Sequence, residues 1–189
     1  MKSKILTILV TLFFQSCSFY SFKGSIPSHI KSVVISPLKN ETSEYMISDI
    51  LNEKIMNLLL LENILDVVSF ENADSKLDII ITSLTDKPNI FTIDNDAEYE
   101  VVNEWKITIN IKIIWYDLVN NEDIIEKNIQ EWSTYSLGID IGKDKLDNDL
   151  DGLIDEEDND EYGIPREGAM RIAMEKVSKR IINELTSTW

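Results

Sequence analysis

The chain is poor in several residue types that common functional sites require. Its 189 residues include one Cys and one His, so neither an internal disulfide nor a four-cysteine or histidine-rich metal site can form within it. Basic residues are also scarce, since 18 Lys and Arg stand against 34 Asp and Glu, for a formal net charge of -16. This charge opposes binding to bare nucleic acid, which requires neutralisation of phosphates. Hydrophobic residues make up 43% of the chain, enough for the core of one domain.

The N-terminal segment has the pattern of an export signal. Lys2 and Lys4 precede an apolar run, residues 5–14, which is too short for a membrane-spanning helix of roughly 20 residues but suits the hydrophobic part of a secretory signal. The small residue Ser16 before Cys17 resembles a bacterial lipobox. This resemblance implies a signal peptide over residues 1–16, cleavage before Cys17 and acylation of Cys17, with residues 17–31 as an acylated tether. A plain signal peptide followed by an incidental cysteine is the alternative.

Hydrophobic periodicity predicts an α+β domain with two helices. Helical spacing runs from Ile47 to Leu61 and again after Pro165, which suits the first turn of a helix. Apolar and polar residues alternate without a break from Trp105 to Trp115, which predicts a long strand with one buried face. Further strands are expected over residues 32–37, 65–70, 77–84 and 124–135, the last with a bulge, and a loop over 86–100. The two helices and the sheet then form a two-layer sandwich.

Several segments together resemble the lipopolysaccharide-assembly lipoproteins (LptE-like). They are Cys17, Tyr20–Lys31, Val33–Ile35 with Asn40-Glu41-Thr42, Ala73-Asp74 with Leu77, Trp115-Tyr116, Glu131–Tyr135 and the final helix to Trp189. The resemblance implies two helices on a four-stranded mixed, largely antiparallel sheet over residues 32–189, interrupted by an insertion over 138–164.

The same resemblance implies a function without catalysis. Such lipoproteins plug the lumen of a large outer-membrane β-barrel (LptD-like) and help deliver lipopolysaccharide to the cell surface. We therefore expect a protein anchored by lipid in the outer membrane of a Gram-negative bacterium, on its periplasmic side or in the barrel lumen. Ser18 after the cysteine agrees with this destination, because an Asp there marks inner-membrane retention in enteric-type sorting.

The polar face of the 105–115 strand is the expected contact surface for the barrel or for lipopolysaccharide. It carries Lys106, Thr108, Asn110 and Lys112. A wet lumen requires a polar partner surface, and the loop over 86–100 is a second candidate contact. An ordinary solvated sheet face explains the same residues equally well. We expect Trp105, Trp115 and Trp132 to belong to the core and His29 to be a surface residue of the tether.

The insertion concentrates the acidity of the chain. Residues 143–161 contain ten acidic residues and two lysines, a net of -8. Its carboxylates follow the spacing of calcium loops of the EF-hand and thrombospondin type 3 kinds, in which alternating oxygens wrap around one ion. The predicted ligands are Asp147, Asp149, Asp151, the Leu153 carbonyl, Asp155 and Asp158, with Gly152 at the turn. A solvated acidic loop is the alternative, and a surface-anchored, calcium-dependent binding or adhesion lipoprotein is the alternative function.

Overall fold

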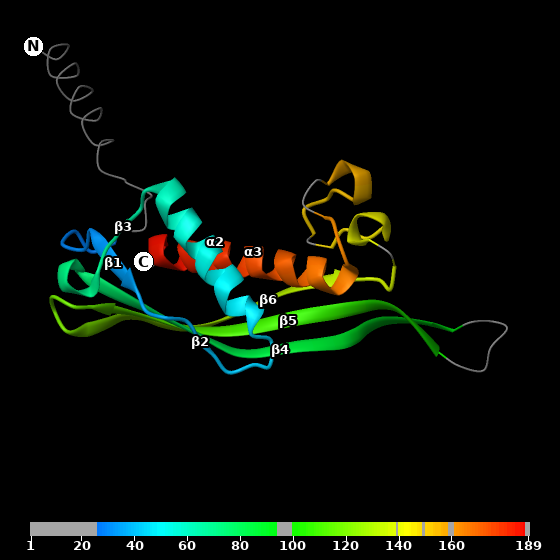
Figure 1. The fold of residues 1–189 in the computed structure, drawn as a ribbon, viewed down its shortest axis with the longest axis horizontal. Coiled ribbons are helices and arrows are strands. Elements are labelled where there is room, and N and C mark those ends of the chain that lie inside the picture. The colour runs from blue at the N-terminus through cyan, green and yellow to red at the C-terminus, as the bar shows by residue number, and fades with distance from the viewer. Residues whose placement is uncertain (1–25, 94–99, 139, 149, 159–160, 188–189) are drawn as a thin grey trace, which may run out of the picture.

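The structure, a computed structural model, describes residues 26–93, 100–138, 140–148, 150–158 and 161–187. Within these residues, two α-helices lie on one face of a long, twisted sheet (Figure 1). The strands are β1 (Ser32–Ile35), β2 (Lys39–Asn40), β3 (Asp66–Val67), β4 (Ser75–Ile93), β5 (Glu100–Asp117) and β6 (Glu122–Tyr135). The helices are α2 (Met46–Glu62) and α3 (Pro165–Thr186), with short 3-10 turns η1 (Phe70–Asn72), η2 (Ile141–Lys143) and η3 (Asp155–Glu157).

The sheet confirms the predicted α+β class. Its strands run in the order β3-β1-β4-β5-β6, with β2 beside β4. The short strands β1, β2 and β3 pair in parallel, whereas the long strands β4, β5 and β6 are antiparallel. Among the described residues the sheet has six strands, whereas the resemblance implies four. β3 lies within the strand expected over residues 65–70, and the two-residue strand β2 falls outside every expected strand.

The prediction of a loop over residues 86–100 is wrong for most of this segment. β4 continues to Ile93, and its residues pair with β5 as far as Ile93 opposite Glu100. Pro88 and Asn89 favour a loop locally, but register shifts on either side of Ile90 let the ladder continue around them. Beyond Ile81, where β2 stops, the other side of β4 has no partner strand among the described residues, so Pro88 interrupts no ladder there.

The predicted alternation of buried and polar residues along β5 is confirmed. Ile107, Ile109, Ile111, Ile113 and Trp115 are fully buried under the helices. The predicted bulge of the next strand is also present: Trp115 pairs with Ile125 and Tyr116 pairs with Asp123, which leaves Ile124 as the extra residue. The bulge returns Ile125 and Ile129 to the buried face.

Each helix buries a stripe of apolar side chains against the sheet. On α2 the buried residues Ile47, Leu51, Ile55 and Leu59 recur every four positions, and the helix ends at Asn63, which adopts the left-handed conformation. α3 begins at Pro165, as predicted, and buries more of its circumference because it packs on β5, β6 and α2.

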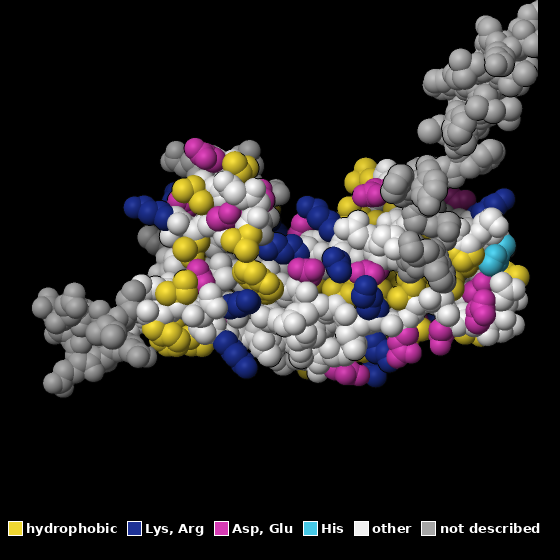
Figure 2. All heavy atoms as spheres, turned by 180° about the vertical axis from the view of Figure 1, so that it is seen from behind, with side chains coloured by type: hydrophobic (Ala, Val, Ile, Leu, Met, Phe, Trp, Pro, Cys, Tyr) yellow, Lys and Arg dark blue, Asp and Glu magenta, His cyan; other side chains and the backbone are white. Residues whose placement is uncertain are grey.

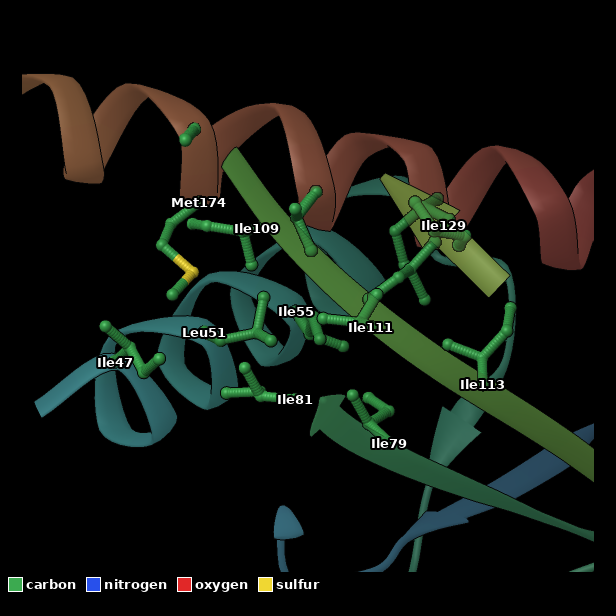
Figure 3. Packing of buried hydrophobic residues seen from close by; sticks show 14 of the residues in the cluster. Ile47, Leu51, Ile55, Ile79, Ile81, Ile109, Ile111, Ile113, Ile129 and Met174 are labelled. Carbon is green, nitrogen blue, oxygen red and sulfur yellow. The ribbon is translucent and has the colours of Figure 1, made fainter. Parts of the chain in front are cut away.

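The core lies between the helices and the sheet (Figure 3). Side chains of α2 meet Ile79 and Ile81 of β4, Ile109 and Ile111 of β5, and Met174 of α3. Ile30 also joins this core at 4% exposure, so residues 26–31, the last part of the expected tether, lie against the domain. No helix of the described ranges is long and apolar enough to cross a membrane.

Candidate functional site

No helix of the described residues covers the second face of the sheet (Figure 1). Because the buried isoleucines of β5 point to the helices, Lys106, Thr108, Asn110 and Lys112 point to this open face, and all four are half-buried. The register places Ser83 opposite Asn110 and Thr85 opposite Thr108. The predicted contact residues thus form one polar row along the middle of a broad strand surface.

Two of these four side chains have polar partners within the sheet. Lys112 Nζ lies 2.5 Å from Glu126 Oε1, and Asn110 Nδ2 donates to Ser83 Oγ at 2.9 Å. Lys106 differs, since its Nζ lies 3.9 Å above the Trp132 ring and it makes no ion pair with a described residue. Lys87 of β4 stands directly opposite Lys106. The row therefore ends in two adjacent positive charges beside an aromatic ring.

The three tryptophans do not share one environment. Trp115 is fully buried, as expected, and Trp105 packs partly buried against the core. Trp132 is half-exposed and lies between Lys106 and Lys176 of α3, whose Nζ is 5.0 Å from the ring and donates to the Trp132 carbonyl at 3.3 Å. Trp132 is therefore a surface residue, because its position on β6 faces away from the helices.

A polar network ties the start of α3 to the sheet. Arg166 donates to Asp86 Oδ2 of β4 at 2.9 Å and to Glu44 Oε1 at 2.6 Å, while the Tyr135 hydroxyl contacts both Asp86 oxygens at 3.0 Å. Burial, followed by the hydrogen bond to Asp86, raises the pKa of Tyr135 to about 12. The hydrogen bond to Glu44 contributes most to raising the pKa of Arg166, against the opposing effect of burial.

The last residues of the expected tether and the first residue of β1 are held by two carboxylates. Asp74 accepts from the Lys31 and Ser32 backbone N–H groups at 2.9 and 3.0 Å and from the Ser32 hydroxyl at 2.8 Å. These bonds, that from Lys31 first, lower the pKa of Asp74. His29, expected as a tether surface residue, is 38% exposed and lies 2.6 Å from Asp117 Oδ2. Cys17 itself lies outside the described residues.

Asp117 shows how a buried carboxylate stays ionised. Its burial by itself raises the pKa, but hydrogen bonds from Asn120, His29 and Val119 outweigh this effect, and the net pKa is lowered. These hydrogen bonds connect the turn between β5 and β6 to His29, which precedes β1.

The insertion is attached to the domain by specific contacts. Ile141 is fully buried and faces Gly168 of α3, and Asp140 Oδ1 accepts from Gly142 N at 3.1 Å and Gly163 N at 3.0 Å, which closes the base of the insertion. Figure 2 shows the insertion as a projection above the body, with acidic and hydrophobic side chains on its surface.

The predicted calcium ligands are arranged around a turn. Asp147 accepts from Asp151 N at 3.1 Å and Gly152 N at 2.9 Å, and Gly152 has φ of 96°, as the spacing requires. Asp151 accepts from Leu153 N, Asp155 accepts from Lys145 N, and Asp158 is buried. Asp149 lies outside the described residues. In the part of the chain that the structure describes, no three acidic, His or Cys side chains form a metal-binding group.

The sequence analysis did not single out two buried polar residues of the insertion. Asn148 is fully buried and Glu161 is 3% exposed, and Asn148 N donates to Glu161 Oε1 at 2.6 Å. Asn148 occupies a position between two predicted ligands and Glu161 follows the loop, so spacing alone singles out neither. Lys87 falls in the segment expected to be a loop, so its position opposite Lys106 on β5 was not predicted.

Comparisons with known proteins give a fold likeness only. No protein-family model and no curated protein matches the chain. Among solved structures, lipoprotein GNA1162 from Neisseria meningitidis shares 12% identity at a TM-score of 0.41, over 55% of this chain and 83% of that chain. A minor lipoprotein from Acinetobacter baumannii shares 10% identity at a TM-score of 0.44, over 82% of this chain and 92% of that chain. Protein XCC0632 from Xanthomonas campestris shares 9% identity at a TM-score of 0.48, over 84% of this chain and 86% of that chain. Likenesses this weak support no argument about function.

Proposed function

We propose that this protein is a lipid-anchored outer-membrane lipoprotein that binds an LptD-like β-barrel and assists lipopolysaccharide transport, without catalysing a reaction. The observation that carries the proposal is the open sheet face. It presents a row of polar side chains from Lys106 to Lys112, which is the kind of surface that a water-filled lumen accommodates. The lipobox-like Ser16-Cys17 and the resemblance to LptE-like proteins in sequence support the anchor and the partner.

The charges of the open face suit limited contact with phosphorylated lipid. Lys112 is neutralised by Glu126, whereas Lys106 and Lys87 stand side by side without an ion pair among the described residues. Under this proposal Lys106 is the residue of the predicted row that meets a lipopolysaccharide phosphate, and Thr108 and Asn110 contact the barrel wall.

Co-purification tests the proposal. The tagged protein, extracted from its own cells in mild detergent, should bring down a large β-barrel protein, and its depletion should lower surface lipopolysaccharide. Thr108→Arg places a long charged side chain on the open face and should abolish recovery of the barrel. Asn57→Arg, on the exposed side of α2, is the matched control and should not. Equal recovery with both variants, or no barrel with the unmodified protein, overturns the proposal.

The alternative is a surface-anchored, calcium-dependent binding or adhesion lipoprotein. It predicts that protease added to intact cells digests the protein and that no barrel co-purifies. Two apolar residues on the surface of the insertion favour this alternative: Leu150 is 64% exposed and Tyr162 is 59% exposed. Apolar side chains on a projection suit contact with a partner.

A further inference from the structure

Large apolar side chains are exposed at the end of the domain where the expected tether joins it. They come from three segments that are separate in sequence: the last turn of α2, the 3-10 turn η1, and the turn between β5 and β6. These residues are Leu60 at 66% exposure, Leu61 at 81%, Phe70 at 62% and Val119 at 58%. Large apolar side chains gathered at one end of a domain favour contact with a partner or a membrane.

Hydrogen bonds and strand pairing bring these three segments together beside residues 26–31. Leu118 N donates to the Asp74 carbonyl at 2.9 Å, and the Ser32 hydroxyl donates to the Asn72 carbonyl of η1 at 3.3 Å. The chain leaves α2 directly for β3, which pairs in parallel with β1. Figure 1 shows the end of α2, β3 and the β5–β6 turn at the same end of the long sheet. We call this end of the domain, with its four exposed apolar residues, the tether end.

The insertion lies at the opposite end of the sheet. At the start of α3, Arg166 binds Asp86, which pairs with Ile107 on β5. Asp117, which binds His29 at the tether end, is ten residues further along β5. Ten residues of strand span about 33 Å. The exposed apolar residues of the insertion are therefore separated from the tether end by at least the length of the domain core.

The length of chain between Cys17 and the domain decides which end can meet the membrane. Ile26, nine residues after Cys17, packs against the core. Nine residues span at most about 32 Å when fully extended. If the insertion stood on the membrane, the tether end would lie about 33 Å or more above it, beyond the reach of this chain. An acylated Cys17 can therefore hold the tether end, and not the insertion, against the lipid surface.

The charges at the tether end indicate which kind of lipid surface it suits. Glu62 and Glu71 are exposed beside Leu61 and Phe70 in sequence, so this end does not attract anionic headgroups. The attraction must come from burial of apolar side chains at the boundary between headgroups and acyl chains. The tether end thus suits a leaflet of zwitterionic lipid.

We propose that the tether end docks on the bilayer that carries the acyl anchor, with Leu60, Leu61, Phe70 and Val119 in the headgroup boundary of a zwitterionic leaflet. Because the anchor keeps this end close to the lipid, docking is an intramolecular step and requires little apolar area. The long sheet then carries the insertion away from the membrane. This inference rests on the acylation of Cys17 in the proposed function, and it does not depend on the barrel.

Quenching of a fluorescent label tests the docking in the acylated full chain, reconstituted in phosphatidylcholine vesicles. Once Cys17 is acylated, Phe70→Cys supplies the only free thiol of the chain for the label. Lipids that carry a nitroxide on the acyl chain close to the headgroup should quench this label about twofold or more. Leu137→Cys, at a position 75% exposed near the insertion, is the matched control and should show no quenching.

Paired glutamate substitutions in the Phe70→Cys chain test the apolar contact. Leu60→Glu/Leu61→Glu should abolish the quenching, whereas the protein stays with the vesicles through its anchor. Tyr45→Glu/Met46→Glu adds the same charge at the other end of α2, where both residues are exposed, and should leave the quenching unchanged. Melting temperatures identify a variant that fails to fold, and the contrast between labels at positions 70 and 137 then decides.

Three results overturn the inference. The first is no quenching at position 70 in the acylated protein, which leaves the tether end to the barrel or to a second copy of the chain. The second is equal quenching at positions 70 and 137, which means that the domain lies flat. The third is unchanged quenching in Leu60→Glu/Leu61→Glu. If the chain carries no fatty acid and does not stay with the vesicles, the anchor of the proposed function fails as well, and the mass of the peptide that contains Cys17 distinguishes this outcome from a failure of docking alone.

Discussion

The contact between Gly168 and Ile141 reverses the expected effect of a helix-favouring substitution. Gly168 lies in the first turns of α3, where replacement by Ala ordinarily stabilises a helix by up to about 1 kcal/mol. A Cβ at Gly168, however, would lie 2.8 Å from Ile141 Cγ2 and 3.0 Å from the Tyr162 carbonyl oxygen. Ile141 is fully buried, so its side chain has no free space to turn into.

The size of the effect follows from these two opposing contributions. Overpacking of a tight interface costs roughly 1–3 kcal/mol, which exceeds the gain in helix propensity. We therefore expect Gly168→Ala to lower the free energy of unfolding by about 1 kcal/mol. In an Ile141→Ala background the Ile141 clash is absent and only the 3.0 Å approach to the Tyr162 carbonyl oxygen remains, so Gly168→Ala should cost clearly less than in the unmodified chain. The double-mutant cycle should then give a coupling energy of about 1–2 kcal/mol.

Urea unfolding followed by tryptophan fluorescence measures all four proteins. Ile141→Ala alone should lower stability by about 2–5 kcal/mol, because it leaves a cavity. Asn57→Ala, on the exposed side of α2, should raise stability by a few tenths of a kcal/mol and checks that helix propensity is detected. The reasoning is refuted if Gly168→Ala stabilises the unmodified chain, or if it has the same effect in both backgrounds.

Three further predictions concern the anchor, the acid response and the core. Cys17→Ala should abolish incorporation of radiolabelled fatty acid and release the protein from membranes, whereas Ser18→Ala should not. The pKa values of Asp74 and Asp117 are lowered in the folded protein. Their contribution to stability is therefore present above the unfolded carboxyl pKa of about 3.9 and is lost as the pH falls through the folded pKa values. Urea unfolding midpoints should drop steeply as the pH falls below about 3.9. Asp117→Asn should flatten this drop, and an unchanged pH profile would exclude the role of Asp117. Trp115→Ala should cost about 3–5 kcal/mol in urea unfolding, and a loss below 1 kcal/mol would contradict its place in the core.

The sequence by itself determined the elements whose pattern is local. The strict alternation from Trp105 to Trp115 predicted a half-buried strand, Pro165 marked the start of the last helix, and the phase change near Ile124 revealed the bulge. These features depend on side-chain periodicity and backbone geometry within a few residues, which a single sequence displays directly. The predicted class of two helices on a mixed sheet followed from them.

Only the tertiary structure decided how distant segments meet. Pro88 and Asn89 favour a loop locally, yet pairing with β5 extends β4 to Ile93, because ladder hydrogen bonds continue around a bulge. The same long-range contacts place Lys87 beside Lys106, set Trp132 on the surface and bury Asn148 between β6 and Glu161. Thr134 and Asp144 fix the orientation of the buried Asn148 amide, and no local sequence pattern predicts this constraint.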